Sequence, residues 1–209
     1  MGFVQHCPDH AYDLYTHMSH VVAGVPPELP LRWAALLHDI GKIPTFTRDE
    51  TGRGHFYGHA GEGAQMADAV LRRLKAPTAL REQVVALIEK HMTRLEPDKK
   101  LLRRWISRLG WETVEGMLYL QQADMGSKGV ETPAEMPRFA LIRQLLDQIR
   151  EESSCLSLKD LAVNGHDLMA LGFRGREVGK MLNLLLEQVL EETLKNEKQQ
   201  LLRFAAEHK

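Results

Sequence analysis

The sequence predicts an all-α fold. Apolar residues recur at helical spacing along almost the whole chain, and no segment shows the period-two run of β-branched residues that is typical of a strand. With 209 residues and 44% hydrophobic content, the chain can bury one good core, or one core plus a small appendage. We therefore expect a helical bundle that carries a small C-terminal helical tail.

Charge and cysteine content argue against several classes of function. The formal net charge of -1 is unfavourable for binding nucleic acid by charge alone, because neutralising phosphates requires a dense Lys/Arg surface. Cys7 and Cys155 lie far apart without a CxxC partner, so neither a disulfide framework nor a thiolate zinc site is expected. The N-terminus lacks the features of a signal peptide, and no apolar run approaches the roughly 20 residues of a membrane helix. We expect a cytoplasmic, reducing environment.

The first part of the chain predicts two helices and a long loop. An apolar stripe from Leu14 to Val25 indicates the first helix, which Pro26 and Pro27 end. Residues 31–40, LRWAALLHDI, are apolar on nearly all sides and predict a central buried helix. Residues 41–58 contain four glycines and one proline, which predicts an irregular stretch of the kind that often lines a functional site.

The remaining chain predicts further helices and a tail domain. These helices are expected at residues 60–74, 80–92, 98–109, 112–125 and 134–152. A shift in composition at residues 151–158, EESSCLSL, predicts a hinge and therefore domains at 1–152 and 153–209. In the tail, Asn164 is a candidate N-cap for a helix at 165–171, and a long helix is predicted at 177–195.

His38-Asp39, followed by Gly41-Lys42, is the sharpest local signal. Two ionisable groups at the end of an apolar helix would cost several kcal/mol to bury unpaired. Coordination to a cation would offset this cost. A hydrogen-bonded His-Asp pair is the simpler interpretation of the dipeptide taken alone.

Other residues of the metal-ligand type fall on the inward faces of other predicted helices. They are His17, His91 and Asp124, while His59 stands at the start of a further predicted helix, where it can face a cavity. Each could be an ordinary core histidine or capping aspartate, but together with His38 and Asp39 they are poorly explained in that way. Imidazole and carboxylate without thiolate suit Mn, Fe, Co, Ni, Mg or Zn. Because six ligands exceed what one catalytic metal with open positions needs, we expect one or two divalent ions.

The series H…HD…H…H…D, centred on HDIGK, resembles the HD phosphohydrolase superfamily. More narrowly, the chain resembles the C-terminal half of bacterial CCA-adding tRNA nucleotidyltransferases. The matching segments are HAYDLYTHM, LLHDIGK, FYGHAGEGAQMADAVLRRLKAP and LAVNGHDLMALGFRGREVGKMLNLLLEQVL followed by KNEKQQLL. The HD series is shared across the superfamily, whereas the tail motif is specific to the narrower family.

The resemblance implies an HD-domain helical bundle and gives particular residues a role. One metal would be held by His17, His38, Asp39 and Asp124, and a second would require His59 and His91. Lys42 would lie close enough to hold a phosphate oxygen, and Arg72 or Arg73 are further phosphate candidates. His10 is a candidate for the substrate side.

The sequence departs from the narrower family in two respects. It shows no glycine-serine strand turn and no paired D-x-D carboxylates, so addition of CTP and ATP is not expected. From Glu151 onward it holds eight Lys/Arg against ten Asp/Glu, which weakens the tRNA-binding role implied for the tail.

We therefore predict a metal-dependent phosphohydrolase, either a phosphodiesterase or a phosphatase. Its substrate would be a small nucleotide-like compound or an RNA-end phosphate, with 2′,3′-cyclic phosphates among the candidates, and no membrane partner is expected. Asp39 would bridge the metals and orient the nucleophile, while Lys42 balances developing charge. Two alternatives stay open: a tRNA-binding, RNA-binding or partner module with a vestigial HD site, and an HD-fold diiron oxygenase.

Overall fold

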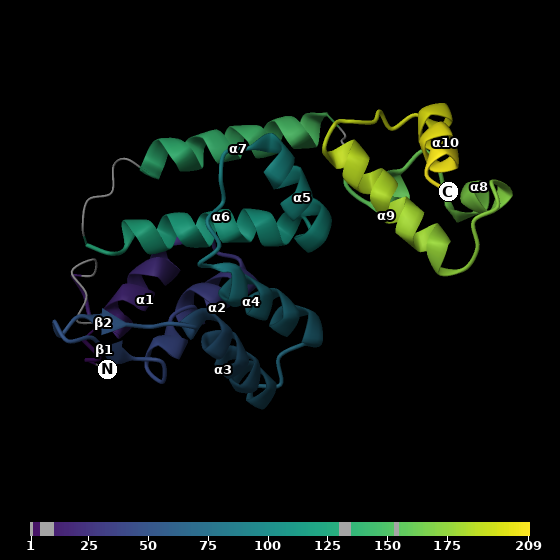
Figure 1. Ribbon diagram of the computed structural model, residues 1–209. Coiled ribbons are helices and arrows are strands. Elements are labelled where there is room, and N and C mark those ends of the chain that lie inside the picture. Colours follow the sequence, from purple (N-terminus) through teal and green to yellow (C-terminus); the bar gives the residue numbers. More distant parts are fainter. Residues whose placement is uncertain (1, 5–10, 130–134, 153–154) are drawn as a thin grey trace. The chain divides into compact units, whose positions relative to one another are not determined.

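The computed structural model describes residues 2–4, 11–129, 135–152 and 155–209. Within these ranges the regular structure consists of ten α-helices, short 3₁₀ turns and one two-stranded sheet, so the predicted all-α class is confirmed (Figure 1). The chain forms two compact units, one of residues 1–95 and 111–140, the other of residues 96–110 and 141–209. The predicted domain boundary at residue 152 falls inside the second unit. No helix in the described ranges is long and apolar enough to span a membrane.

The first unit is a bundle built around one central helix. Its helical elements are α1 (Leu14–Gly24), α2 (Leu29–Leu37), the 3₁₀ turn η1 (Ile40–Lys42), α3 (His59–Arg73), α4 (Thr78–Lys90) and α6 (Trp111–Gly126). Helix α2 packs against α1, α4 and α6, while α3 packs against α4 and η1 (Figure 1). Leu31, Ala34 and Ala35 of α2 are fully or almost fully buried. The expectation of a central buried helix is therefore met.

Local signals explain where the first helices begin and end. The side chain of Asp13 caps α1 by accepting a hydrogen bond from the backbone N–H of Thr16 at 2.7 Å. Pro30 lies in the first turn of α2, where its missing N–H has no helical partner to lose. Helix α2 ends at Leu37, three residues before the predicted end at Ile40, and the chain turns into η1. His38 and Asp39 therefore occupy the turn rather than the helix.

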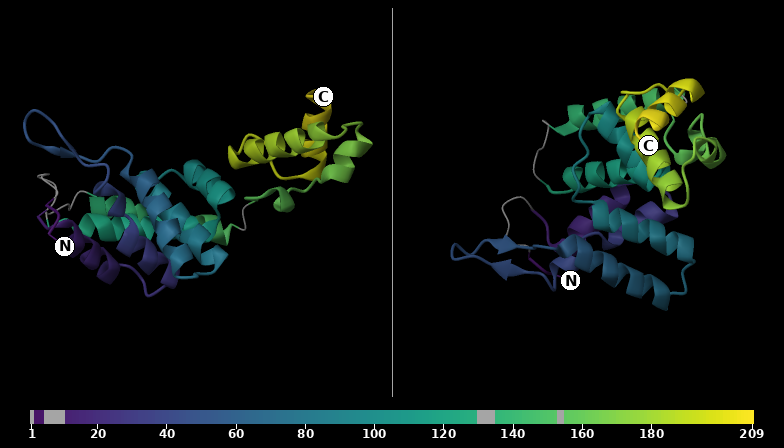
Figure 2. Two further views of the ribbon diagram at one scale, coloured as in Figure 1. Left: turned by 90° about the horizontal axis from the view of Figure 1, so that it is seen from below. Right: turned by 45° about the vertical axis from the view of Figure 1, so that its right-hand side comes forward.

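The loop before α3 contains a short antiparallel hairpin that the sequence did not predict. Strand β1 (Thr47–Arg48) pairs with β2 (Gly54–His55), with Thr47 opposite His55. Two-residue strands are too short to show an alternating pattern in a sequence. Asp49 closes the hairpin by accepting hydrogen bonds from the backbone N–H groups of Thr51 and Arg53. Figure 2 shows the hairpin reaching away from the helices of the first unit.

The second unit is also helical and has an apolar core. Its elements are α5 (Lys99–Leu109), η3 (Leu158–Asp160), α8 (Gly165–Ala170), α9 (Arg176–Leu190) and α10 (Lys198–Glu207), and α7 (Met136–Glu151) contributes to both units. Asn164 caps α8 as expected, accepting hydrogen bonds from the backbone N–H groups of His166 and Asp167. Helix α9 ends at Leu190 and not at the predicted Lys195, because Glu192 adopts a left-handed conformation with φ of 61°.

Candidate metal centre

All six predicted ligand residues converge inside the first unit. They are His17 from α1, His38 and Asp39 from the turn after α2, His59 from the start of α3, His91 from the end of α4, and Asp124 from α6. Their possible ligand atoms form two groups in which every atom lies within 4.8 Å of the others. The first group contains His17, His38, Asp39 and Asp124, and the second contains Asp39, His59 and His91. Asp39 belongs to both groups.

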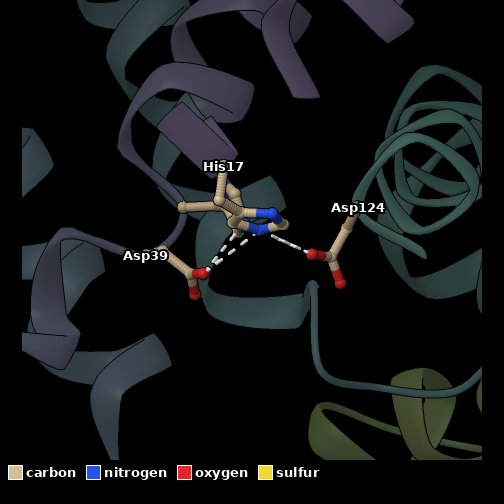
Figure 3. A group of neighbouring side chains, drawn as sticks. His17, Asp39 and Asp124 are labelled. Atoms are coloured by element: carbon tan, nitrogen blue, oxygen red, sulfur yellow. Dashed lines mark ion pairs between the residues drawn. The ribbon is translucent and has the colours of Figure 1, made fainter. Parts of the chain in front are cut away.

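In the first group, two imidazole rings face two carboxylates. Nε2 of His17 lies 3.0 Å from Oδ1 of Asp124 and 3.6 Å from Oδ2 of Asp39, and Figure 3 shows its ring between them. Nε2 of His38 lies 3.3 Å from Oδ2 of Asp39 and 3.7 Å from Oδ1 of Asp124. The side chains of His17, His38 and Asp39 are at most 2% exposed, whereas that of Asp124 is 22% exposed. The group therefore opens toward solvent on the Asp124 side.

The second group uses the other oxygen of the shared carboxylate. Oδ1 of Asp39 lies 3.5 Å from Nε2 of His59 and 3.8 Å from Nε2 of His91. The two Nε2 atoms are themselves 3.2 Å apart. One oxygen of Asp39 thus faces each group, which is the arrangement expected of a bridging carboxylate.

Backbone carbonyls fix the orientation of all four imidazole rings. The Nδ1 atoms of His17, His38, His59 and His91 lie 3.2, 2.9, 2.8 and 2.6 Å from the carbonyl oxygens of Ser127, Ala35, Phe56 and Ile88. A carbonyl oxygen can only accept, so each Nδ1 must carry the proton and donate it. In a neutral ring the lone pair is then on Nε2, which points into the cluster.

The electrostatics of the cluster favour a positive charge within it. Burial lowers the pKa of His38, but the carboxylates of Asp39 and Asp124 outweigh burial and raise that pKa to about 10. Burial opposes ionisation of Asp39 and Asp124 too, yet hydrogen bonds and charges from His38 and other neighbours hold both pKa values well below their usual range. For His91, burial together with the charge on His38 lowers the pKa to about 4.

The turn η1 places a lysine beside the shared carboxylate. Nζ of Lys42 lies 2.7 Å from Oδ2 of Asp39 and 5.3 Å from the centre of the Phe56 ring, and the residue is only 6% exposed. Gly41 allows this turn to press against α3, since a Cβ at this position would collide with the carbonyl oxygen of His59 and lie 2.5 Å from the backbone nitrogen of Gly63. This close backbone contact brings His59 next to Asp39.

The predicted phosphate-binding arginines do not join the cluster. Arg72 lies thirteen residues after His59 on α3, about 20 Å along the helix axis. Its Nε donates to Oδ2 of Asp68 at 2.7 Å, and its side chain is 66% exposed. Arg73 follows it, also exposed. His10 lies outside the described residues.

The structure adds one cation that the sequence reasoning missed. Nζ of Lys128 lies 3.8 Å from Oδ2 of Asp124, the most exposed carboxylate of the cluster. Lys128 lies two residues beyond the end of α6, so a spacing of four residues from Asp124 was the only signal in the sequence and helical periodicity could not place its side chain. Lys42 and Lys128 thus approach the cluster through its two aspartates.

Fold and site together define a helical protein with a buried His/Asp cluster suited to divalent cations. The chain belongs to the family described as "tRNA nucleotidyltransferase domain 2 putative", whose model matches residues 56–205. The predicted relation to the C-terminal half of CCA-adding enzymes is thereby confirmed. His59, His91 and Asp124 lie within the matched range, whereas His38 and Asp39 precede it.

Individual relatives agree with this assignment. The chain is 36% identical over 166 residues to the A-adding tRNA nucleotidyltransferase of Deinococcus radiodurans, a match that covers 77% of this chain and 37% of that protein. It is 36% identical over 194 residues to the CC-adding tRNA nucleotidyltransferase of Thermus thermophilus, covering 89% and 42% of the two chains. The chain therefore spans about two fifths of the length of these relatives. No solved structure matches it significantly.

Proposed function

We propose that this chain is a metal-dependent phosphohydrolase of the HD type. Its substrate would be a nucleotide or RNA-end phosphate, with 2′,3′-cyclic phosphates among the candidates. The observation that carries the proposal is the convergence of four imidazole Nε2 atoms on two carboxylates inside the first unit. Such donor sets are typical of hydrolytic metal sites that contain no thiolate.

The donor atoms fit one or two divalent cations. Nε2 of His59 and Nε2 of His91 are 3.2 Å apart although both Nδ1 atoms donate to carbonyls, so in neutral rings two lone pairs face each other. Nε2 of His38 is buried, and its contacts with Oδ2 of Asp39 at 3.3 Å and Oδ1 of Asp124 at 3.7 Å are longer than a strong hydrogen bond. A cation in each group would turn these unfavourable contacts into ligand bonds. His17, His38, Asp39 and Asp124 would hold one ion, and Asp39, His59 and His91 would hold the other.

Asp39 and Lys42 would then have distinct roles in hydrolysis. Divalent ions at such sites supply Lewis acidity and lower the pKa of water. Asp39, with one oxygen toward each group, would link the two ligand groups and orient the attacking water. Lys42, already beside Asp39, would turn its ammonium toward a phosphate oxygen and offset the negative charge that develops there. Substrate would enter on the more exposed Asp124 side.

The proposal is tested by hydrolysis assays on protein that has been stripped with chelator and reloaded with each of Mn, Fe, Co, Ni, Zn and Mg. The panel contains a generic phosphodiester, 2′,3′-cyclic nucleotides and phosphomonoesters. We expect Lys42→Ala to keep the parent metal content while hydrolysis falls on the order of 10²-fold. Arg72→Ala is the matched control, because Arg72 is exposed and distant. Absence of hydrolysis with every metal would overturn the proposal.

A second candidate function is binding of tRNA or another RNA. It is supported by the relatives, whose names describe them as tRNA nucleotidyltransferases. An RNA-binding module with an idle metal centre would bind tRNA equally well with metal present or chelated, and Asp39→Asn would not change its affinity. Fluorescence titrations of labelled tRNA with the parent protein and with Asp39→Asn, each with metal and with chelator, measure these affinities.

A further inference from the structure

The short segment between the hairpin and α3 carries an aromatic ring that is left in solvent. Tyr57 is 80% exposed, whereas Phe56 before it is half-buried and His59 is buried. Leaving a tyrosine ring in water forgoes the favourable burial that aromatic side chains usually provide. The residues on both sides of Tyr57 are packed against the protein, so Tyr57 is exposed although its neighbours in the sequence are held in place.

The exposed ring is held in one orientation by a chain of contacts. It lies parallel to the His55 ring, with 5.4 Å between ring centres and 6° between planes, and its Oη is 3.4 Å from Nδ1 of His55. Nε2 of His55 is in turn 2.8 Å from Oδ2 of Asp49, the residue that closes the hairpin. A ring fixed in this way loses little conformational entropy when a ligand stacks on it.

The segment that carries Tyr57 is connected directly to the candidate metal centre. The carbonyl oxygen of Phe56 accepts the hydrogen bond that orients His59, and the Phe56 ring contacts the Lys42 ammonium. Tyr57 is two residues from His59, so their Cα atoms are at most about 7 Å apart. The backbone thus keeps Tyr57 close to a ligand residue of the metal centre, so a nucleotide with its phosphate at that centre could bring its base to Tyr57.

We propose that Tyr57, supported by His55, is a stacking platform for the nucleobase next to the phosphate that is cleaved. This inference rests on the proposed hydrolase function and narrows its substrate class to base-bearing phosphates, either free nucleotides or RNA ends. Every base presents a π-face to an aromatic ring, so the platform tolerates any base.

The test compares a nucleoside 2′,3′-cyclic phosphate with the abasic ribose 2′,3′-cyclic phosphate, so that the two substrates differ only in the base. We expect Tyr57→Ala to lower the ratio of kcat/KM for the base-bearing substrate to that for the abasic one about tenfold. Tyr57→Phe keeps the ring and should retain the parent ratio. Tyr15→Ala, which removes an exposed tyrosine from α1, is the control. A ratio unchanged in Tyr57→Ala overturns the platform and leaves the hydrolase standing.

A binding titration separates failure of the stacking platform from failure of the proposed hydrolase function. Chelated protein is titrated with a fluorescent mononucleotide and with a labelled oligonucleotide that ends in a 2′,3′-cyclic phosphate. Weaker binding to Tyr57→Ala than to Tyr57→Phe supports the platform even if no substrate is hydrolysed. The ligand that shows the larger loss identifies the source of the base. Equal binding by both variants to both ligands overturns the platform.

Discussion

The interior of the first unit contains His17, His38, Asp39, Lys42, His59 and His91, whereas the described interior of the second unit is apolar except for Arg103. Nη1 of Arg103 donates to Glu192 at 2.9 Å, so this guanidinium is paired. Burying apolar groups stabilises a fold, while burying ionisable groups costs stability unless they are paired or ligated. The second unit therefore buries mainly groups that stabilise a fold, whereas the first unit buries ionisable groups whose cost has to be offset by pairing or by ligands.

The largest effect on the first unit is expected from a change in Asp39, the carboxylate that both ligand groups share. Asp39→Asn keeps the shape of the side chain but removes its charge, and an amide is a poor bridging ligand. We expect hydrolysis to fall to background and bound metal to drop, as measured by rate assays and elemental analysis. Asp68→Asn, which changes an aspartate paired with Arg72 away from the cluster, should leave both unchanged. Full activity in Asp39→Asn would show that the site is assigned incorrectly.

Removing the second ligand group tests how many cations the interior of the first unit holds. The His59→Ala, His91→Ala double variant should stay folded, retain about one metal and lose most of its hydrolysis, because His17, His38, Asp39 and Asp124 still form a complete set. Elemental analysis beside circular dichroism is the measurement. Equal metal content in variant and parent would leave a single-metal hydrolase in which these histidines contact substrate.

The apolar interior of the second unit should respond to mutation in stability and not in metal content. Leu185 of α9 is fully buried, so Leu185→Ala should lower the free energy of unfolding of that unit by about 2–5 kcal/mol. Chemical denaturation followed by circular dichroism measures the loss. Met169→Ala, at a residue that is 40% exposed, should have a much smaller effect. A fall in bound metal in Leu185→Ala would contradict the separation between the two interiors.

Cys155 offers the mildest test of the second interior. Burial, reinforced by the charge of Asp160, raises the pKa of its thiol from 9.0 to about 11. At pH 8 a pKa two units higher leaves roughly a hundredfold less thiolate, the reactive form. In a Cys7→Ser background, iodoacetamide should therefore modify the native chain far more slowly than the denatured chain, and the native rate should keep rising as the pH increases toward 11. Mass spectrometry gives both rates, and equal rates at pH 8 would contradict the expected burial.

The sequence predicted the ligand cluster better than it predicted the chain around it. Helical periodicity placed His17, His91 and Asp124 on the inward faces of their helices. Inward faces of helices in one bundle are directed toward the same interior, so these side chains were expected to lie near one another. Periodicity carries no information about backbone partners, so the carbonyls that orient the imidazoles were not foreseen. Arg72 was grouped with the site through the family resemblance, although thirteen residues at the rise of an α-helix already place it about 20 Å from His59.

Short or weakly patterned elements were missed for a related reason. The hairpin strands have two residues each, which is too short for an apolar period, whereas Leu201 and Ala205 of α10 do have helical spacing, so that helix could have been predicted. The early end of α2 was missed because His38, Asp39 and Ile40 continue a helical pattern although the chain has already turned.

The contact between Gly41 and α3 has a consequence for mutational tolerance. A side chain at position 41 would meet backbone atoms of His59 and Gly63, and a Cβ on Gly63 would lie 3.3 Å from the backbone nitrogen of Gly41. Compensating substitutions relieve steric conflict by shrinking a neighbouring side chain, but a backbone atom cannot be made smaller. Second-site suppressors of a Gly41 variant should accordingly be absent from residues in direct contact. In redesign, the turn at Gly41 and the start of α3 must therefore be transplanted as one piece.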